Sequence, residues 1–109
     1  MTTGQLVSLD EYMHTSYEHD AEYVEGRIIH RAMPQKPHSK MQKFLLMRLA
    51  AVGGPLGYEV WPEQRVQTQS DHCRVPDLCV TKGEPDENIF TSPPFLCIEI
   101  LSPDDSPPR

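Results

Sequence analysis

The sequence predicts an α+β domain, with a mixed or antiparallel sheet flanked by helices. Three observations support this fold class. Apolar residues recur at helical spacing over residues 39–52. Residues 22–33 alternate around a Glu-Gly pair at 25–26 that suits a hairpin turn. Two short apolar segments, residues 74–81 and 95–101, are typical of strands.

A short helix and the hairpin are expected first. Residues 8–11 match a capping box with Ser8 as the N-cap, which predicts a helix that runs to about residue 15. The hairpin follows over residues 22–33. Pro34 and Pro37 are expected to end its second strand, because proline cannot donate to a sheet ladder.

The longest helix is predicted over residues 39–52, and the Gly-Gly-Pro sequence at 53–55 is expected to stop it. A strand follows over residues 58–69, with a break near Pro62. The two apolar segments come last and are joined by the polar loop of residues 82–94.

Length and composition limit the chain to one small domain. At 109 residues it can bury a modest core, and we assign the domain to residues 1–103, with residues 104–109 as a proline-rich tail. No apolar run approaches the length of a membrane span. The three cysteines lack CxxC spacing, which argues against a zinc site or a disulfide framework and favours reduced thiols in the cytoplasm.

Two acidic residues interrupt the two apolar segments. Glu99 lies within residues 95–101, which are expected to form a strand covered on both faces, and Asp77 lies within residues 74–81. A buried carboxylate costs several kcal/mol unless it is protonated or paired with a cation. Two such carboxylates on neighbouring strands therefore suit a divalent metal ion.

The alternation of strand side chains makes this pairing testable. If the two segments pair in antiparallel fashion with Asp77 opposite Glu99, then Cys79 lies beside Cys97. Oxygen ligands with open coordination positions suit Mg²⁺ or Mn²⁺, ions that activate water for phosphodiester hydrolysis.

A purely structural interpretation is the alternative. In that case Asp77 forms a turn at the end of a strand, and Glu99 pairs with Arg74 or Arg65.

The acidic segments also resemble a known family. Residues 74–78 (RVPDL) and 97–103 (CIEILSP) resemble the two-part signature of the Uma-two family, restriction-endonuclease-like proteins of the PD-(D/E)xK nuclease superfamily. Residues 7–12, 22–26 and 37–38 are similar to further parts of the family pattern, so the resemblance covers nearly the whole chain.

The resemblance implies a metal-dependent endonuclease that acts on DNA. Asp77 and Glu99 would be ligands of Mg²⁺ or Mn²⁺, with the carbonyl group of Ile100 as a third ligand. Glu22 matches an acidic residue that the superfamily often supplies from an early element, where it would hold a water molecule or a second metal. His38 falls where the family often has a histidine, at the entrance to a helix.

Basic residues gather in and before the predicted long helix. His38, Lys40 and Lys43, together with Lys36 and Arg48, form a candidate face for DNA phosphates in a chain whose net charge is −6. An ordinary solvated helix face explains the same residues equally well.

The chain also departs from the family pattern. The lysine that the superfamily places two residues after Glu99 is replaced by Leu101, and the chain ends before the expected lysine-bearing helix and last strand. We therefore expect a truncated member of the family whose exposed sheet edge favours a homodimer. The alternative function is a non-catalytic remnant or interaction module of the same fold.

Overall fold

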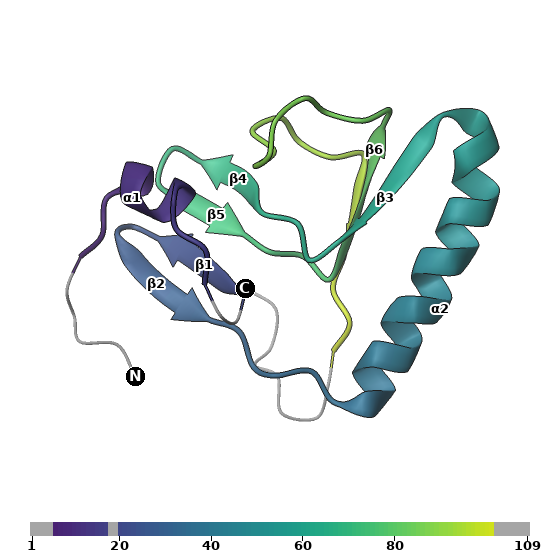
Figure 1. Cartoon of the computed structure of the whole chain (residues 1–109), viewed down its shortest axis with the longest axis horizontal. Coiled ribbons are helices and arrows are strands. Elements are labelled where there is room, and N and C mark those ends of the chain that lie inside the picture. The colour runs from purple at the N-terminus through teal and green to yellow at the C-terminus, as the bar shows by residue number, and fades with distance from the viewer. Residues whose placement is uncertain (1–5, 18–19, 102–109) are drawn as a thin grey trace.

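The computed structural model describes residues 6–17 and 20–101, and the predicted α+β class is confirmed (Figure 1). The helices are α1 (Leu9–Met13) and α2 (Lys36–Gly53), the latter continued by a 3₁₀ turn at Gly54–Leu56. The strands are β1 (Ala21–Val24), β2 (Arg27–His30), β3 (Tyr58–Pro62), β4 (Val66–Gln69), β5 (His72–Arg74), β6 (Leu78–Lys82) and β7 (Leu96–Ile98). They form two antiparallel sheets, ordered β2-β1-β5-β4 and β3-β6-β7.

The four-stranded sheet is covered by α1, which begins as predicted. The Ser8 hydroxyl accepts a hydrogen bond from the N–H of Glu11 and caps the helix. The helix then buries Tyr12 completely, against Tyr23 and Cys73. The Tyr12 hydroxyl donates to the carbonyl of Ala21 at 2.7 Å, which satisfies its only polar atom.

The hairpin of β1 and β2 turns at Glu25 and Gly26, as the sequence predicts. Both residues have positive φ angles, 50° and 89°, which are the conformations that a two-residue primed turn requires. Arg65 joins this sheet to α1 from the side, because its guanidinium donates to the carbonyls of Tyr12 and Thr15 at 3.0 and 2.7 Å. The Arg65 guanidinium therefore bonds to residues 12 and 15, and not to Glu99.

The three-stranded sheet has α2 beside its outer strand β3, at the opposite end of the molecule from α1 (Figure 1). Here the prediction needs one correction. The helix begins at Lys36 and not at residue 39, and Pro37 lies in its first turn. Proline is tolerated there because the first N–H groups of a helix have no partner within the helix. Pro37 thus starts the helix and does not end the hairpin.

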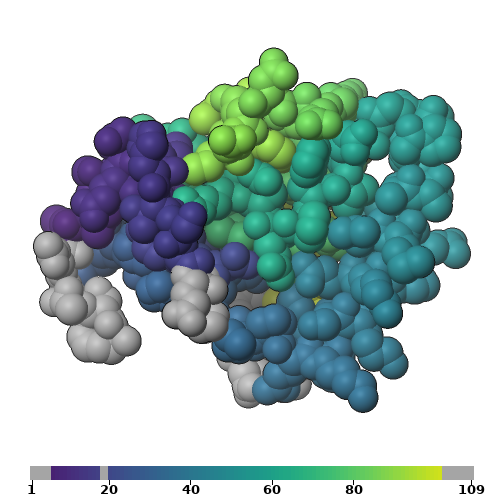
Figure 2. Space-filling model, viewed as in Figure 1, coloured from purple at the N-terminus to yellow at the C-terminus, as the bar shows by residue number. Residues whose placement is uncertain are grey.

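Packing on this side is thin. No residue of α2 is buried, and the side chains of Met41, Phe44, Met47 and Val52 are exposed along it. In the space-filling view α2 occupies one end of the molecule (Figure 2). A small core forms instead around Cys79, Val66 and Phe90. Phe90 belongs to the loop of residues 82–94, so this loop, which the sequence analysis described as polar, contributes a buried apolar side chain.

The two acidic segments are shorter strands than the sequence predicts. Residues 74–81 are divided between β5 and β6, because the ladder is interrupted at residues 75–77 around Pro76. The expectation that residues 95–101 are covered on both faces was wrong. Strand β7 is an edge strand, and Phe95 and Leu101 are 61% and 64% exposed.

Among the residues that the structure describes, no helix is long and apolar enough to cross a membrane. The boundary predicted at residue 103 and the tail of residues 104–109 lie outside the described residues.

Candidate functional site

Asp77 lies at the junction of the two sheets. The chain leaves the four-stranded sheet at Arg74 and enters the three-stranded sheet at Leu78, and Asp77 is the last residue of the link. Only 1% of Asp77 is exposed. Its main-chain carbonyl accepts hydrogen bonds from the Gln42 side chain of α2 at 2.9 Å and from the N–H of Glu63 at 3.2 Å. Two separate segments therefore fix the backbone of this residue.

The carboxylate of Asp77 receives three donors. Oδ1 is 2.7 Å from Nη2 of Arg31 and 3.2 Å from Nε2 of His38, and Oδ2 accepts the N–H of Ile100 at 2.7 Å. Buried carboxylates need this kind of compensation. The structure thus brings Asp77, His38 and Ile100 together. Ile100 makes its contact through its N–H group, whereas the sequence analysis assigned a role to its carbonyl.

Glu99 lies directly after β7 and continues the line of the sheet register. The ladder pairs Cys79 with Cys97 and Leu78 with Ile98, so the predicted neighbours Cys79 and Cys97 are confirmed. One more step in this register would set Asp77 against Glu99. The ladder ends one residue earlier, at Ile98, and the Glu99 side chain is 50% exposed.

Arg31 joins the two acidic residues. The same Nη2 nitrogen that contacts Asp77 lies 3.6 Å from Oε1 of Glu99. Burial disfavours the charged guanidinium, but Asp77 together with Glu99 and Glu22 more than offsets that effect and raises the pKa of Arg31. Arg31 thus forms the ion pair with Glu99 that the sequence analysis assigned to Arg74 or Arg65, and Arg74 acts on Glu99 only through its charge at longer range.

Sequence reasoning missed Arg31. It lies 46 residues before Asp77, just after β2, and no local pattern marks it. The one available signal was the requirement for a cation beside two carboxylates, which every basic residue of the chain could have met.

Glu22 reaches the same region from β1. It is 6% exposed, and its Oε2 accepts the N–H of Val75 at 2.9 Å while Oε1 lies 3.3 Å from Nε of Arg74. Glu22 therefore holds the link that carries Asp77. Among the described residues, the potential ligand atoms of Glu22, Asp77 and Glu99 do not all lie within 4.8 Å of one another.

The charges of these groups act on Glu99. Partial burial raises the pKa of its carboxyl group, Arg31 counteracts this, and the carboxylates of Asp77 and Glu22 raise it further. The pKa of Glu99 thus stays raised even with Arg31 in place, and partial burial is the largest cause.

His38 and the lysines of α2 lie on opposite faces of this helix. His38 is in the first turn, with Nε2 on Asp77, while its Nδ1 is buried without a hydrogen-bond partner in the described part of the chain. At 100° per residue, Lys36, Lys40 and Lys43 share the face of α2 that points away from His38. The structure does not bring Lys40 and Lys43 to Asp77, and their role in substrate binding stays a prediction.

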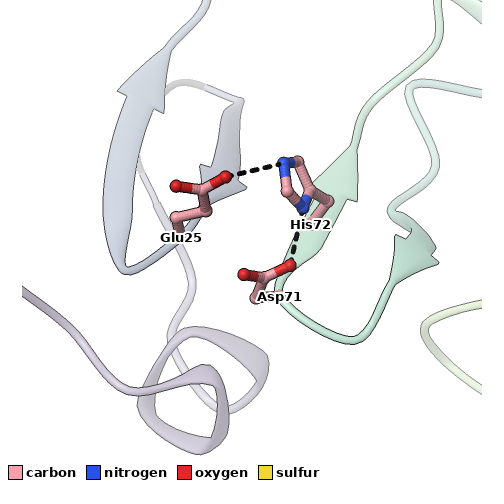
Figure 3. A group of neighbouring side chains, drawn as sticks. All are labelled: Glu25, Asp71 and His72. Atoms are coloured by element: carbon pink, nitrogen blue, oxygen red, sulfur yellow. Dashed lines mark hydrogen bonds and ion pairs between the residues drawn. The ribbon is translucent and has the colours of Figure 1, made fainter.

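A second group of possible metal ligands links two turns of the four-stranded sheet. Glu25, Asp71 and His72 offer ligand atoms within 4.8 Å of one another (Figure 3). Nδ1 of His72 is 2.8 Å from Asp71, and Nε2 is 3.8 Å from Glu25. Both nitrogens of the ring already face carboxylates, and the two acids are exposed. The contacts of His72 with Glu25 and Asp71 therefore join the two turns to each other.

The donor chemistry at the sheet junction fits a divalent ion. Carboxylate oxygens of Asp77 and Glu99 already converge on one positively charged nitrogen, and such hard oxygen ligands are those that Mg²⁺ and Mn²⁺ prefer. The guanidinium of Arg31 occupies the position between the two carboxylates.

Comparison with known proteins agrees with this architecture. A sequence model of the Uma2 family, described as "Putative restriction endonuclease", matches residues 9–109. A solved structure described as a putative nuclease belonging to DUF820, from Anabaena variabilis, is 36% identical, with a TM-score of 0.79 over 92% of this chain. The match covers 61% of that protein's own length. No match was found among curated proteins. Since the family model spans most of the sequence and the solved relative shares the fold, the chain belongs to the Uma2 family of restriction-endonuclease-like proteins.

Proposed function

We propose that this chain supplies the acidic centre of a nuclease that hydrolyses phosphodiester bonds in DNA with Mg²⁺ or Mn²⁺. The observation that carries this proposal is the meeting of Asp77 and Glu99 on a single cationic nitrogen. The names of the family and of the solved relative support the class of reaction. Because this chain spans only 61% of that relative, the activity of the longer protein is also part of the proposal.

In this proposal Asp77 and Glu99 bind the metal ion, and the carbonyl of Ile100 is a third ligand. The N–H of Ile100 keeps Asp77 oriented through its 2.7 Å hydrogen bond to Oδ2. A bound ion of this kind lowers the pKa of a coordinated water and offsets negative charge on the scissile phosphate. Glu22 accepts the N–H of Val75 and adds negative charge near the site. We propose that it also holds a water molecule or a second metal ion.

His38 and the lysines would serve the substrate. His38 is close enough to Asp77 to orient its carboxylate and to approach a phosphate group bound there. Lys36, Lys40 and Lys43 recur at positions i, i+4 and i+7 of α2, so one exposed face carries three positive charges. We propose that Lys40 and Lys43 contact phosphates of the DNA backbone outside the reacting position.

The setting of the protein is part of the same proposal. We place it in the cytoplasm with its thiols reduced. The exposed edge at β7, with Phe95, Leu96 and Leu101, is the surface through which two copies would form a homodimer.

A non-catalytic interaction module of the same fold is the second candidate. Two observations favour it: Leu101 stands where the superfamily has a lysine, and Arg31 already occupies the position between the two acids. A positively charged group near the attacking water is typically worth about 10²–10³ in rate, so its loss could silence the site.

Calorimetric titration of Mn²⁺ distinguishes the two candidates. The nuclease proposal expects one binding site in the wild-type chain and its loss in Asp77→Asn and Glu99→Gln. Glu59→Gln is the matched control, because Glu59 is an exposed residue of β3. The same proteins are then incubated with supercoiled plasmid DNA and Mg²⁺, and nicking should follow metal binding. A folded wild-type chain that binds no Mn²⁺ would leave the interaction module as the function.

A further inference from the structure

We infer that Arg31 is a built-in counter-ion of the acidic pair, and that a divalent cation binds at Asp77 and Glu99 only by displacing it. This inference rests on the proposed metal site. The contacts that carry it are the distances from one nitrogen, Nη2 of Arg31, to the two carboxylates, 2.7 Å to Asp77 and 3.6 Å to Glu99.

The position of Arg31 is determined by more than these two carboxylates. Its Nη1 donates to the carbonyl of Val75, in the same link that carries Asp77. Its main-chain N–H donates to the carbonyl of Asp20 at 2.9 Å. The side chain is 23% exposed, which is low for an arginine at the end of an outer strand. Arg31 is therefore fixed both at its main chain and at its guanidinium group.

Two cations cannot share this position. At a separation of a few ångströms, two like charges repel by several kcal/mol in the partly desolvated interior of a protein. An arginine does not lose its charge at any working pH, so it cannot relieve the repulsion by releasing a proton. The guanidinium must therefore move away when a metal ion binds.

The surroundings offer the displaced side chain another acidic partner. Glu63 adjoins Asp77, since its N–H donates to the Asp77 carbonyl at 3.2 Å. Asp20 is also adjacent, since the main-chain N–H of Arg31 donates to its carbonyl at 2.9 Å. Movement of the guanidinium toward Glu63 and Asp20 would keep it paired while it vacates the place between Asp77 and Glu99.

The inference also explains how Asp77 is tolerated in the absence of metal. A carboxylate that is 1% exposed is unfavourable without a positive partner, and Arg31 supplies one. Metal binding and the native contacts of Arg31 are then in competition. The wild-type site should bind divalent ions weakly, and removal of Arg31 should strengthen the binding.

The test is a titration of Mn²⁺ into the wild-type chain and into Arg31→Gln, with heats and melting temperatures measured on the same samples. We expect Arg31→Gln to bind Mn²⁺ at least about tenfold more tightly, because the competing charge is gone. In chelator its melting temperature should be lower than that of the wild type, and Mn²⁺ should recover most of the difference. Arg27→Gln is the control, because Arg27 is an exposed arginine of β2, the strand that Arg31 follows, and both quantities should stay unchanged.

Arg31→Lys keeps the experiment decisive if Arg31→Gln does not fold. Lysine retains the charge but cannot contact Val75 and both carboxylates at once, so its hold on the acids is weaker and Mn²⁺ affinity should rise. Equal or weaker Mn²⁺ binding by the folded Arg31 variants, with wild-type binding intact, would overturn the inference and leave the proposed nuclease standing. Absence of Mn²⁺ binding from every folded protein would overturn both.

Discussion

The two sheets of this molecule are built from similar short strands but differ in how they are covered. The four-stranded sheet buries Tyr12, Tyr23 and Cys73 beneath α1. The three-stranded sheet has β6 buried, yet α2 beside it buries no residue and the edge strand β7 is exposed. We call the four-stranded sheet the closed sheet, because a helix with buried side chains covers it. We call the three-stranded sheet, with α2 beside it, the open sheet.

This difference accounts for the two acids of the candidate site. Asp77 lies where the closed sheet ends, and it is 1% exposed and held by three donors. Glu99 comes from the open sheet and is 50% exposed. One acid of the pair is therefore fixed by packing while the other is half exposed, an arrangement that would suit the entry of the proposed metal ion from solvent.

The largest expected effect is on the core of the closed sheet. Tyr12→Ala removes a fully buried ring and its hydrogen bond to Ala21, so the free energy of unfolding should fall by about 3–5 kcal/mol. Phe44→Ala, in the open half, removes a ring that is 56% exposed and should change stability by less than about 0.5 kcal/mol. Urea denaturation measures both. Equal losses would mean that α2 is as well packed as α1.

Glycine substitutions sharpen the comparison on a smaller scale. Gly26→Ala forces a left-handed φ of 89° on alanine and sets its Cβ 3.3 Å from Leu6, so it should destabilise by about 1–2 kcal/mol. Gly54, at the end of α2, has a helical φ of −52° and open space at its Cβ position. Gly54→Ala should stabilise by about 0.4–1 kcal/mol. Melting temperatures report the sign of each change, and a loss in Gly54→Ala would contradict the open character of that end.

A still smaller effect is expected at Glu63, which follows β3 in the open sheet. Burial and the nearby Asp20 raise the pKa of this carboxyl group. An acid whose pKa is raised on folding favours the native state while it is protonated, and this contribution is lost as the pH rises through its pKa. Glu63→Gln should therefore be more stable than the wild type at pH 7, by no more than about 0.5 kcal/mol because solvent screens the group. The difference should vanish in acid below the ordinary value of 4.5, and thermal melts across that range measure it.

Thiol labelling compares the two sheets without changing stability. Cys97, on the exposed edge, should react with a disulfide reagent in the native protein, whereas the buried Cys73 and Cys79 should react only on opening. Burial raises the pKa of Cys79 to about 11, which slows it further. Of the two buried thiols, Cys79 should react first, because it lies in the open half. Cys97→Ser identifies the fast phase, and faster reaction of Cys73 than of Cys79 would reverse the comparison.

Local signals explain which parts of the fold the sequence could predict. The Ser8 cap, the turn at residues 25–26 and the break at Pro62 each depend on neighbouring residues, and the structure confirms them. Pro37 was misjudged because a proline ends a strand and begins a helix equally well. Pro76 was a local signal for the division of residues 74–81, but the largely apolar pattern of this segment concealed it.

Only the part of the site that depends on the alternation of strand side chains could be predicted from the sequence. Counting by two along β6 and β7 placed Cys79 beside Cys97 and brought Asp77 and Glu99 to the same end of the pair. Exposure of β7 depends on what covers it, and the partner Arg31 lies 46 residues before Asp77, so neither follows from a local pattern.

The pairing of β6 with β7 has a last consequence for assembly of the site. A slip of one residue would turn every β7 side chain to the opposite face and set Ile98 or Ile100 in the place of Glu99. The hydrogen bond from the Ile100 N–H to Asp77 would be lost at the same time. Chains that pair out of register would thus carry no acidic pair, so correct strand alignment and the proposed cation site would form together or not at all.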